Sequence, residues 1–331
     1  MTGRSPRVLI SWASYASIVL GPAGMVSLYI ANTDNGWFDF LSTRKNLTEV
    51  NFWQPGGKEF HAIEPGELFA FRLKSPRDKI GGFGILSNSS VLPLQIAWET
   101  FRESNGVASY EALRFAIARY RPDEHVGPTT NIGCRILVEP VFFPADAWIT
   151  LPASWSKNIV GGKRYSTDTA DGLHLWNQLL DVAQAVSTTI DNGFAEPVAR
   201  YGSPTLITPR LGQGAFRIAV TETYGRQCAV SNGKVLPALD AAHIRPYSDG
   251  GLHIKSNGIL LRKDIHSILD AGYATVGTDY RFVVSGKVKE VFNNGEEYRR
   301  LHGKQLRLPK NKSDWPDLEF LRWHNSQRYL G

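Results

Sequence analysis

Apolar and polar positions alternate in several short stretches of the first half of the chain, and these stretches predict β-strands. Gly66–Leu73, GELFAFRL, has the alternation of a half-buried strand, and Ile80–Asn88 and Gly133–Phe143 are two further strand candidates. Ser109–Arg121 instead has the apolar spacing of an amphipathic helix that begins with a serine N-cap. Short strands mixed with helices predict a compact α/β barrel-like module over residues 25–165.

The second half of the chain has a different pattern. Residues 166–209 are predicted to be a helical linker, and residues 210–331 are predicted to be a second domain that ends in a segment rich in Arg and Lys. Within this domain a short apolar strand ends at His243, and a second strand, NGILL, begins at Asn257. The segment LRKDIHSILDAG then predicts a helix that contains His266 and stops at a C′ glycine.

The first residues of the chain are predicted to lie outside the folded domains. Val8–Ile30 contains no charged residue and follows two arginines, so it has the character of a secretory signal or a membrane anchor. Gly21-Pro22-Ala23-Gly24 interrupts this run, and VSLYIANTDNGWF after Met25 already predicts a first strand. We therefore expect residues 1–24 to be an extension upstream of a start at Met25, and we expect a cytoplasmic protein with no membrane partner.

Composition changes this picture only a little. Of the 331 residues, 42% are hydrophobic and 21% are charged, which is typical of a folded globular protein. The formal net charge of +6 fits a polyanionic partner such as nucleic acid, although many basic proteins bind nothing acidic. The two cysteines, Cys134 and Cys228, form no CxxC pair, which excludes a four-cysteine zinc site and indicates a reducing compartment.

His243, Asn257 and His266 follow one another closely, one from each predicted element of a strand, strand and helix series. Hydrolysis of a phosphodiester requires a base for water, a cation for the developing charge, and a rigid holder for both. A neutral imidazole suits the first role, an imidazole with a carboxylate can hold a divalent ion, and an asparagine can orient the base. This set favours a nuclease. The alternative is that the two histidines are surface or satisfied core histidines.

The segment from Arg210 to Gly272 resembles the HNH nuclease family, which has the ββα-metal or His-Me finger fold. The resemblance rests on the His–Asn–His order, on the order of the elements, and on the phrases AAHIRPYS, SNGILLRKDIH and LDAG. It implies an α+β chain in which a ββα-metal nuclease domain follows the N-terminal module. It also implies that His243 is the general base, that Asn257 orients it, and that His266 binds the metal, Mg²⁺ or Mn²⁺.

The second metal ligand departs from the family pattern. Many members place an acidic residue or a histidine directly before the first histidine, but this chain has Ala242 there. Asp240 lies two residues earlier, and an extended strand points both side chains to the same side, so Asp240 is the expected substitute. Asp270, one helical turn after His266, is the other candidate, and a polar contact at the helix end explains it equally well.

Four polar residues are candidates for contact with DNA phosphates. Arg245 and Arg262 flank the predicted metal site and could clamp phosphate oxygens. Arg210 and Gln213 lie on one face of the predicted first helix of this domain and could meet the DNA backbone. For all four, ordinary solvation of a protein surface is an equally good explanation.

The N-terminal domain resembles the PUA-like superfamily, with its EVE, ASCH and YTH relatives, especially the versions that are fused to HNH cores. The resemblance rests on ANTDNGWFDFL, EVNFWQPGGKEFHAIEPGELFAFRL, IGGFGILSNSSVLPLQIAWETF, GCRILVEPVFFP and WSKNIVGGKRY. It implies a pocket that takes up a flipped modified base between aromatic walls. The candidates for the walls and for amides that read the base edge are Trp37, Trp53, Phe83, Asn35 and Asn88. Each aromatic residue could equally belong to the core.

The two resemblances together predict a modification-dependent, type IV-like restriction endonuclease. Its substrate would be double-stranded DNA that carries a methylated or hydroxymethylated cytosine. A homodimer is also considered, because one finger cuts one strand per engagement. The alternatives are an HNH nuclease that acts on unmodified DNA or RNA, and a nucleic-acid reader whose catalysis has decayed at Ala242.

Overall fold

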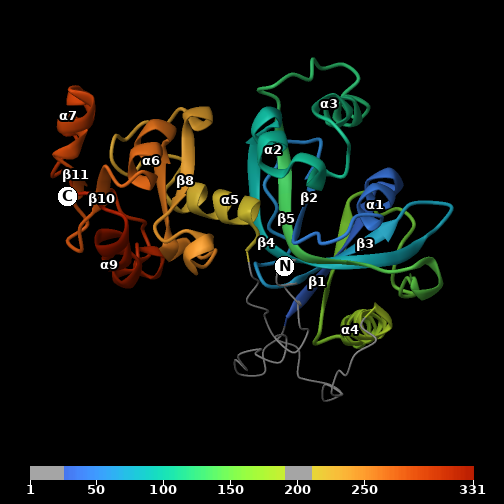
Figure 1. The fold of residues 1–331 in the computed structure, drawn as a ribbon. Coiled ribbons are helices and arrows are strands. Elements are labelled where there is room, and N and C mark those ends of the chain that lie inside the picture. The colour runs from blue at the N-terminus through green and yellow to red at the C-terminus, as the bar shows by residue number, and fades with distance from the viewer. Residues whose placement is uncertain (1–25, 191–210) are drawn as a thin grey trace, which may run out of the picture. The chain divides into compact units, whose positions relative to one another are not determined.

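The computed structural model describes residues 26–190 and 211–331 (Figure 1), so the predicted extension at residues 1–24 lies outside the described residues. The strands are β1 Ser27–Thr33, β2 Glu49–Gln54, β3 Leu68–Leu73, β4 Lys79–Pro93, β5 Asn131–Phe142, β6 Ile149–Thr150, β7 Gly162–Ser166, β8 Leu239–His243, β9 Gly258–Arg262, β10 Ala274–Val276 and β11 Phe282–Val284. The α-helices are α1 Asn35–Ser42, α2 Leu94–Phe101, α3 Tyr110–Ala118, α4 Ala170–Ile190, α5 Gln213–Thr223, α6 Lys263–Asp270, α7 Lys287–Phe292, α8 Glu296–Arg299 and α9 Leu318–Gln327. Within these ranges, none of the helices combines the length and the hydropathy of a membrane span.

The strands of the first half join one sheet. Its strand order is β2-β5-β4-β3-β1-β7, and β6 pairs with β4. β1 and β3 run parallel, whereas the pairs β1–β7, β2–β5, β3–β4 and β4–β6 are antiparallel. In the described part of the chain the order has two ends, at β2 and β7, and does not close into a barrel. The mixed α/β character agrees with the prediction, but the closed barrel form is not seen.

The predicted strands of the first half appear as β3, β4 and β5, and the predicted helix appears as α3. The Ser109 hydroxyl accepts a hydrogen bond from the Ala112 backbone nitrogen at 3.2 Å and caps α3. β4 continues beyond the predicted end at Asn88 and ends at Pro93. The polar residues after Asn88 therefore belong to the strand and not to a loop. Ser90 is buried, and its hydroxyl donates to Glu222 at 2.7 Å in place of solvent.

The described chain forms two compact units. The first contains Phe60–Leu86 together with the described parts of residues 1–47 and 139–209. The second contains Thr48–Glu59, Ser87–Val138 and the described part of residues 210–331. Strands β4 and β5 contribute residues to both units.

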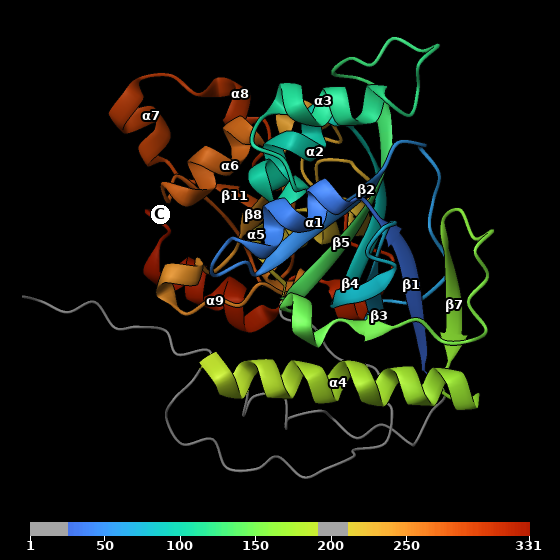
Figure 2. The ribbon, with the colours of Figure 1, turned by 90° about the vertical axis from the view of Figure 1, so that its right-hand side faces the viewer.

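The first unit has an aromatic core. Phe71 and Phe142 stack with their ring centroids 5.6 Å apart, and Trp37 meets Phe71 edge to face at 5.3 Å. A Cβ atom at Gly81 would lie 2.8 Å from the Phe38 ring, so β4 requires a glycine where α1 approaches it. The long helix α4 contacts β1 and β7, as Figure 2 shows.

The second unit contains the hairpin of the His–Asn–His pattern. β8 and β9 are antiparallel, and His243 pairs with Gly258. Both α5 and α6 contact both strands of this hairpin. Cover from two helices explains why Gly258 to Leu261 are all buried and why the strand shows no apolar–polar alternation. The core around the hairpin includes Phe216, Val220, Ile259, Leu261, Ile265 and Leu269.

Candidate active site

Aromatic packing holds the imidazole of His243 at the end of β8. Phe216 of α5 stacks on the ring, with centroids 3.8 Å apart and planes inclined by 13°, and His253 meets it edge-on at 4.9 Å. Gly258, opposite His243 in the hairpin, makes room for this packing, because a Cβ atom there would lie 2.9 Å from the Phe216 ring. The Nε2 atom of His243 is buried and has no hydrogen-bond partner among the described residues.

The surroundings of His243 set its protonation state. Burial, reinforced by the charges of His253 and His266, lowers the pKa of His243 to about 4. At neutral pH the imidazole is therefore uncharged, and one ring nitrogen carries a free lone pair. This is the state that a general base requires.

Asn257 lies fully buried beside the loop that joins β8 and β9. Its Oδ1 accepts from the Arg245 backbone nitrogen at 2.9 Å, and its Nδ2 donates to the carbonyls of Arg245 and Leu252, each at 2.9 Å. The side chain here accepts one hydrogen bond and donates two, which matches the carbonyl oxygen and the NH₂ group of an amide. Each such bond contributes about 1 kcal/mol. Asn257 thus closes the loop that directly follows His243.

A chain of charged groups continues from the hairpin to α6. His266 Nδ1 lies 3.2 Å from Asp240 Oδ2, and His266 Nε2 lies 3.1 Å from Asp270 Oδ2. Arg217 Nε lies 3.5 Å from Oδ1 of Asp240. Burial lowers the pKa of His266, but the two carboxylates outweigh it and raise the pKa to about 9. Burial raises the pKa of Asp240, and the hydrogen bond from His266 with the charge of Arg217 reverses this, so that the net shift is downward.

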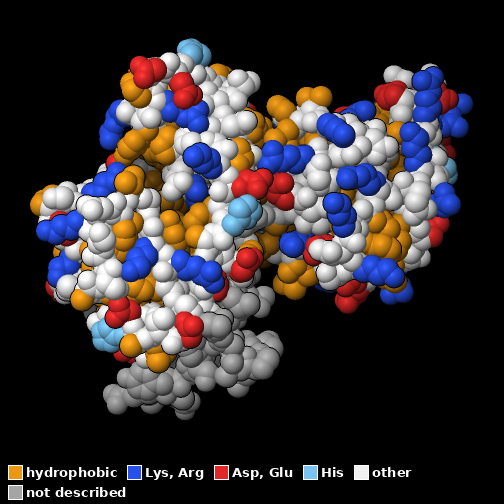
Figure 3. Space-filling view, turned by 180° about the vertical axis from the view of Figure 1, so that it is seen from behind, with side chains coloured by type: hydrophobic (Ala, Val, Ile, Leu, Met, Phe, Trp, Pro, Cys, Tyr) orange, Lys and Arg blue, Asp and Glu red, His pale blue; other side chains and the backbone are white. Residues whose placement is uncertain are grey.

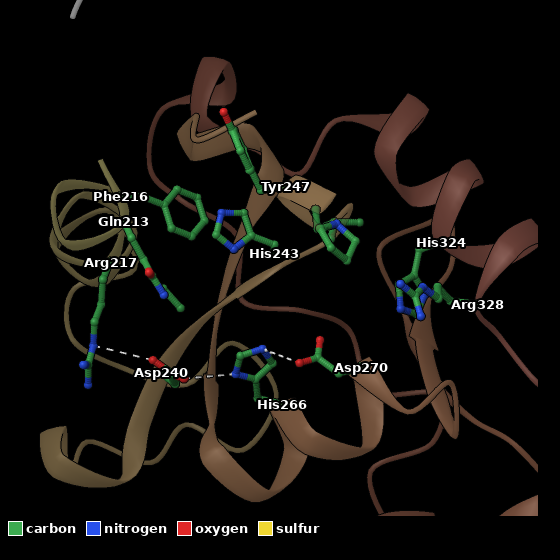
Figure 4. A pocket seen from close by; sticks show the side chains of 13 residues that line it. Gln213, Phe216, Arg217, Asp240, His243, Tyr247, His266, Asp270, His324 and Arg328 are labelled. Carbon is green, nitrogen blue, oxygen red and sulfur yellow. Dashed lines mark hydrogen bonds and ion pairs between the residues drawn. The ribbon is translucent and has the colours of Figure 1, made fainter. Parts of the chain in front are cut away.

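These side chains surround one cavity of about 490 Å³, and Figure 4 shows Asp240, His243, His266 and Asp270 around it. The lining residues are Gln213, Phe216, Arg217, Asp240, Ala241, His243, Ile244, Pro246, Tyr247, His266, Asp270, His324 and Arg328. A neutral imidazole and an imidazole–carboxylate pair therefore share one space. Such a space can accept a proton from water and hold a cation close by.

Comparison with protein families identifies this part of the chain. Residues 228–277 match the model of the HNH endonuclease family. They form an HNH endonuclease domain. The match spans β8, β9, α6 and β10, and it includes all three residues of the His–Asn–His pattern. The family predicted for this domain from its sequence is thereby confirmed.

The other comparisons add little. One solved structure, a "Modification dependent TagI restriction endonuclease", is 13% identical in sequence, with 87% of this chain and 78% of that chain covered and a TM-score of 0.29. No curated protein matches the chain.

The predicted phosphate contacts have different surroundings in and around the HNH domain. Gln213 lines the cavity. Arg245 donates from Nε to a backbone carbonyl at 2.7 Å, and Arg262 is paired with Asp264, so neither side chain lines the cavity. Arg210 lies outside the described residues. Phosphate contact by these four residues stays a prediction.

The cavity wall also includes Phe216, Tyr247, His324 and Arg328, none of which was among the candidates from the sequence. Phe216 has the spacing of a core residue in α5, and Tyr247 follows a proline in a turn, so neither carried a functional signal. His324 and Arg328 come from α9 and its end, well outside the HNH match, and they reach the wall only through packing of that helix. In the sequence, the only functional signal of that segment was its enrichment in Arg and Lys.

The predicted base-pocket residues also have different surroundings. In the first unit, Trp37 and Phe83 are only 5% and 4% exposed. The Asn35 amide donates to the Lys74 carbonyl and accepts from the Lys74 backbone nitrogen. In the second unit, Trp53 donates from Nε1 to a backbone carbonyl at 2.9 Å, and Asn88 is half-buried. Their assignment to a base pocket stays a prediction.

The arrangement of His266 limits how a metal could be held. Across residues 26–190 and 211–331, no group of three or more His, Cys, Asp or Glu side chains surrounds a common point as a metal centre requires. Asp240 and Asp270 flank opposite nitrogens of His266, so an ion on one nitrogen is reached by one carboxylate only. An imidazole with one carboxylate suits a divalent ion that keeps several water ligands, as Mg²⁺ does. Because the pKa of His266 is raised to about 9, either pair becomes a two-ligand site only when the ion displaces the proton of the His266 nitrogen that it binds.

The buried neutral state of His243 has a consequence for folding stability. Burial lowers the pKa of His243 from 6.5 to about 4, so between these pH values the unfolded chain binds a proton that the folded chain does not. The free energy of unfolding should therefore fall as the pH is lowered through this window. His243→Ala is expected to flatten part of that fall in chemical denaturation between pH 7 and pH 4 with EDTA. An equal acid sensitivity in both proteins would contradict a desolvated imidazole.

Proposed function

We propose that this chain is a modification-dependent DNA endonuclease. In this proposal residues 25–165 recognise a modified cytosine, residues 166–209 link the two parts, and the HNH domain within residues 210–331 hydrolyses phosphodiester bonds. The observation that carries the nuclease part is the convergence of His243 and the Asp240–His266 pair on one cavity.

The cavity residues have distinct roles in this proposal. His243 takes the proton of the attacking water, because its imidazole is neutral and Phe216 holds the ring in place. Asn257 orients His243 by closing the loop that follows it. Asp240 and His266 would hold a divalent ion, Mg²⁺ or Mn²⁺, and such an ion would supply stabilisation of the negative charge on the leaving oxygen. The resemblance to HNH nucleases implies products with 5′-phosphate and 3′-hydroxyl ends.

The need for selection supports a role for the N-terminal domain. A nuclease domain that contacts phosphates and not base edges has little sequence preference. Without selection by another domain, it would cut the DNA of its own cell. We infer a PUA-like fold for residues 25–165 from the sequence motifs, and the mixed sheet is compatible with such a module. A modified base can be read from all sides once it is flipped out of the stack, at a cost of about a few kcal/mol.

The net charge of the chain is compatible with DNA, and the face drawn in Figure 3 shows no continuous basic groove. The formal net charge is +6. On the face drawn in Figure 3, Lys and Arg side chains are spread over the surface, with acidic side chains between them. A surface of this kind attracts phosphates in general, and the attraction weakens as salt is added. Such attraction does not distinguish one base from another, so this proposal assigns the recognition of the modified base to a pocket.

A panel of plasmids tests the proposed function. The protein is incubated with Mg²⁺ or Mn²⁺ and matched plasmids that are unmodified, methylated or hydroxymethylated at cytosine, beside a His243→Ala control. Metal-dependent cutting of modified plasmids alone is the expected result. Equal cutting of all plasmids would eliminate selection by modification. Binding of modified DNA without any cutting would favour a reader whose catalysis has decayed.

The same assay addresses the oligomeric state. One HNH domain engages one strand at a time, so a homodimer is the simplest route to a double-strand break. Nicked circles as the main product would indicate a monomer, and linear plasmid formed without accumulation of nicked circles would indicate a dimer.

A further inference from the structure

The helix α5 depends on a distant residue for its N-terminal cap. Its own N-cap residue, Gly212, has no side chain to offer, and the first turn contains no acidic residue. Glu49 of β2 takes over this role. Its Oε1 accepts from the Gly214 backbone nitrogen at 2.7 Å, and its Oε2 accepts from the Ala215 backbone nitrogen at 2.6 Å. A carboxylate with both oxygens on free N–H groups is a strong cap, because it also offsets the positive end of the helix dipole.

Two glycines make this contact sterically feasible. A Cβ atom at Gly212 would lie 2.6 Å from Cδ of Glu49, and one at Gly214 would lie 2.8 Å from both Oε1 of Glu49 and the Phe101 ring. Burial raises the pKa of Glu49, although the two backbone hydrogen bonds oppose the shift. The first turn of α5 therefore has glycines at the two positions where a Cβ atom would collide with the Glu49 side chain.

The other end of α5 is tied to strand β4. Glu222 accepts from the Ser90 hydroxyl at 2.7 Å and from Arg226 Nε at 3.0 Å. Arg226 in turn donates to the Val91 carbonyl at 2.8 Å. Side chains and backbone of the sheet strands β2 and β4 therefore hold both ends of the helix.

Between these two ends, α5 presents the residues that touch the catalytic groups. Phe216, the residue after the capped Ala215, stacks on the imidazole of His243. Arg217 follows it and lies beside Asp240. A shift of α5 would therefore move the surface on which the base rests and the cation that neighbours a candidate metal ligand.

We propose that Glu49 is a positioning residue of the nuclease, which fixes α5 so that Phe216 and Arg217 hold His243 and Asp240 in place. The proposal deepens the function proposed above and rests on it, since it concerns the same nuclease site. Glu49 lies outside the HNH match and on the same strand as Trp53, a predicted contact to the modified base. Glu49 would thus make the nuclease site dependent on a strand of the N-terminal region.

The first test is Glu49→Gln in the full chain. Glutamine keeps the shape but offers one acceptor and points an N–H donor at a backbone N–H, so one cap bond is lost and a repulsion is added. We expect the maximal rate of plasmid cutting to fall by about 10-fold or more, while the KM for DNA changes little, because a small misplacement of reacting groups alone slows chemistry. Looser packing of Phe216 should also expose the base, so the His243 pKa, followed by NMR, should rise from about 4.

Glu111→Gln is the matched control, because this carboxyl is 59% exposed and forms a surface ion pair with Arg114. It should leave both readouts unchanged. Equal cutting and an equal His243 titration in wild type and Glu49→Gln would overturn the proposal. If the wild-type protein cuts no plasmid, the proposed function fails, and the His243 titration still decides the role of Glu49.

Gly212→Ala provides a second route to the same contact. Its φ of −74° suits any residue, so the only expected conflict is between the new methyl group and the Glu49 carboxylate. Gly212→Ala should therefore slow cutting in the wild-type background and add nothing in a Glu49→Ala background. Effects that simply add in this double-mutant cycle would contradict a shared contact.

Discussion

His243→Ala is expected to lower the rate of metal-dependent DNA cutting by about 10²-fold to 10⁴-fold, the range that general base catalysis supplies. The imidazole is neutral at pH 7 and lies in the same cavity as the candidate metal ligands. No other neutral histidine of the cavity wall can replace it, because His324 is bonded to Thr275 and to a backbone carbonyl. The measurement is the initial rate of plasmid cutting at saturating DNA.

DNA binding should survive this substitution. His243 contributes no charge at neutral pH, so its removal takes away no phosphate contact of the electrostatic kind. His125→Ala, at an exposed position, is the control for loss of an ordinary histidine. A His243→Ala protein that cuts as fast as wild type would remove the base from the proposed mechanism, and one that no longer binds DNA would point to a binding role instead.

Asp240→Asn is expected to raise the Mg²⁺ concentration needed for half-maximal cutting by at least about 10-fold, and Asp270→Asn is expected to raise it less. Changes around a metal commonly cost about 10-fold to 100-fold in affinity. Asp240 lies on the ordered strand β8 and is 34% exposed, whereas Asp270 ends α6 and is 57% exposed. The more enclosed and better fixed carboxylate loses less conformational freedom on binding an ion.

The two aspartates form a matched pair, because each lies about 3 Å from one nitrogen of His266. Asparagine keeps the size of the side chain and removes the charge. Cutting rates across a Mg²⁺ or Mn²⁺ series, together with calorimetric titration of the ion, separate the two sites. A larger effect of Asp270→Asn would move the ion to the Nε2 side of His266. Unchanged cutting in EDTA would remove the metal from the mechanism altogether.

The order of the elements around the catalytic set follows from local sequence. The strand that ends at His243, the strand that starts after Asn257 and the helix with His266 follow one another along the chain, and the two strands pair as a hairpin across the loop of residues 244–257. Because these elements are neighbours along the chain, the sequence alone predicted that the three residues belong to one structural unit. The same locality explains the correct N-cap of α3, which depends on residues three positions apart.

Contacts between residues far apart in the chain could not be predicted in this way. The alternation of a strand placed Asp240 near the base, but only the packing of α6 put Asp240 and Asp270 on opposite nitrogens of His266. Trp37 stood beside polar residues in the sequence and yet packs into an aromatic core, because α1 turns its apolar face to the sheet. Polar neighbours along the chain say little about which side of a helix a ring occupies.

The sequence by itself therefore determined the family of the nuclease domain and the series of elements that carries His243, Asn257 and His266, because these depend on neighbours along the chain. Only the tertiary structure decided what surrounds them. The stacking of Phe216 on His243, the cavity wall from α9 and the cap from Glu49 join residues that are distant in sequence. Such contacts arise when whole elements pack against one another, and no local pattern records which side chains then meet.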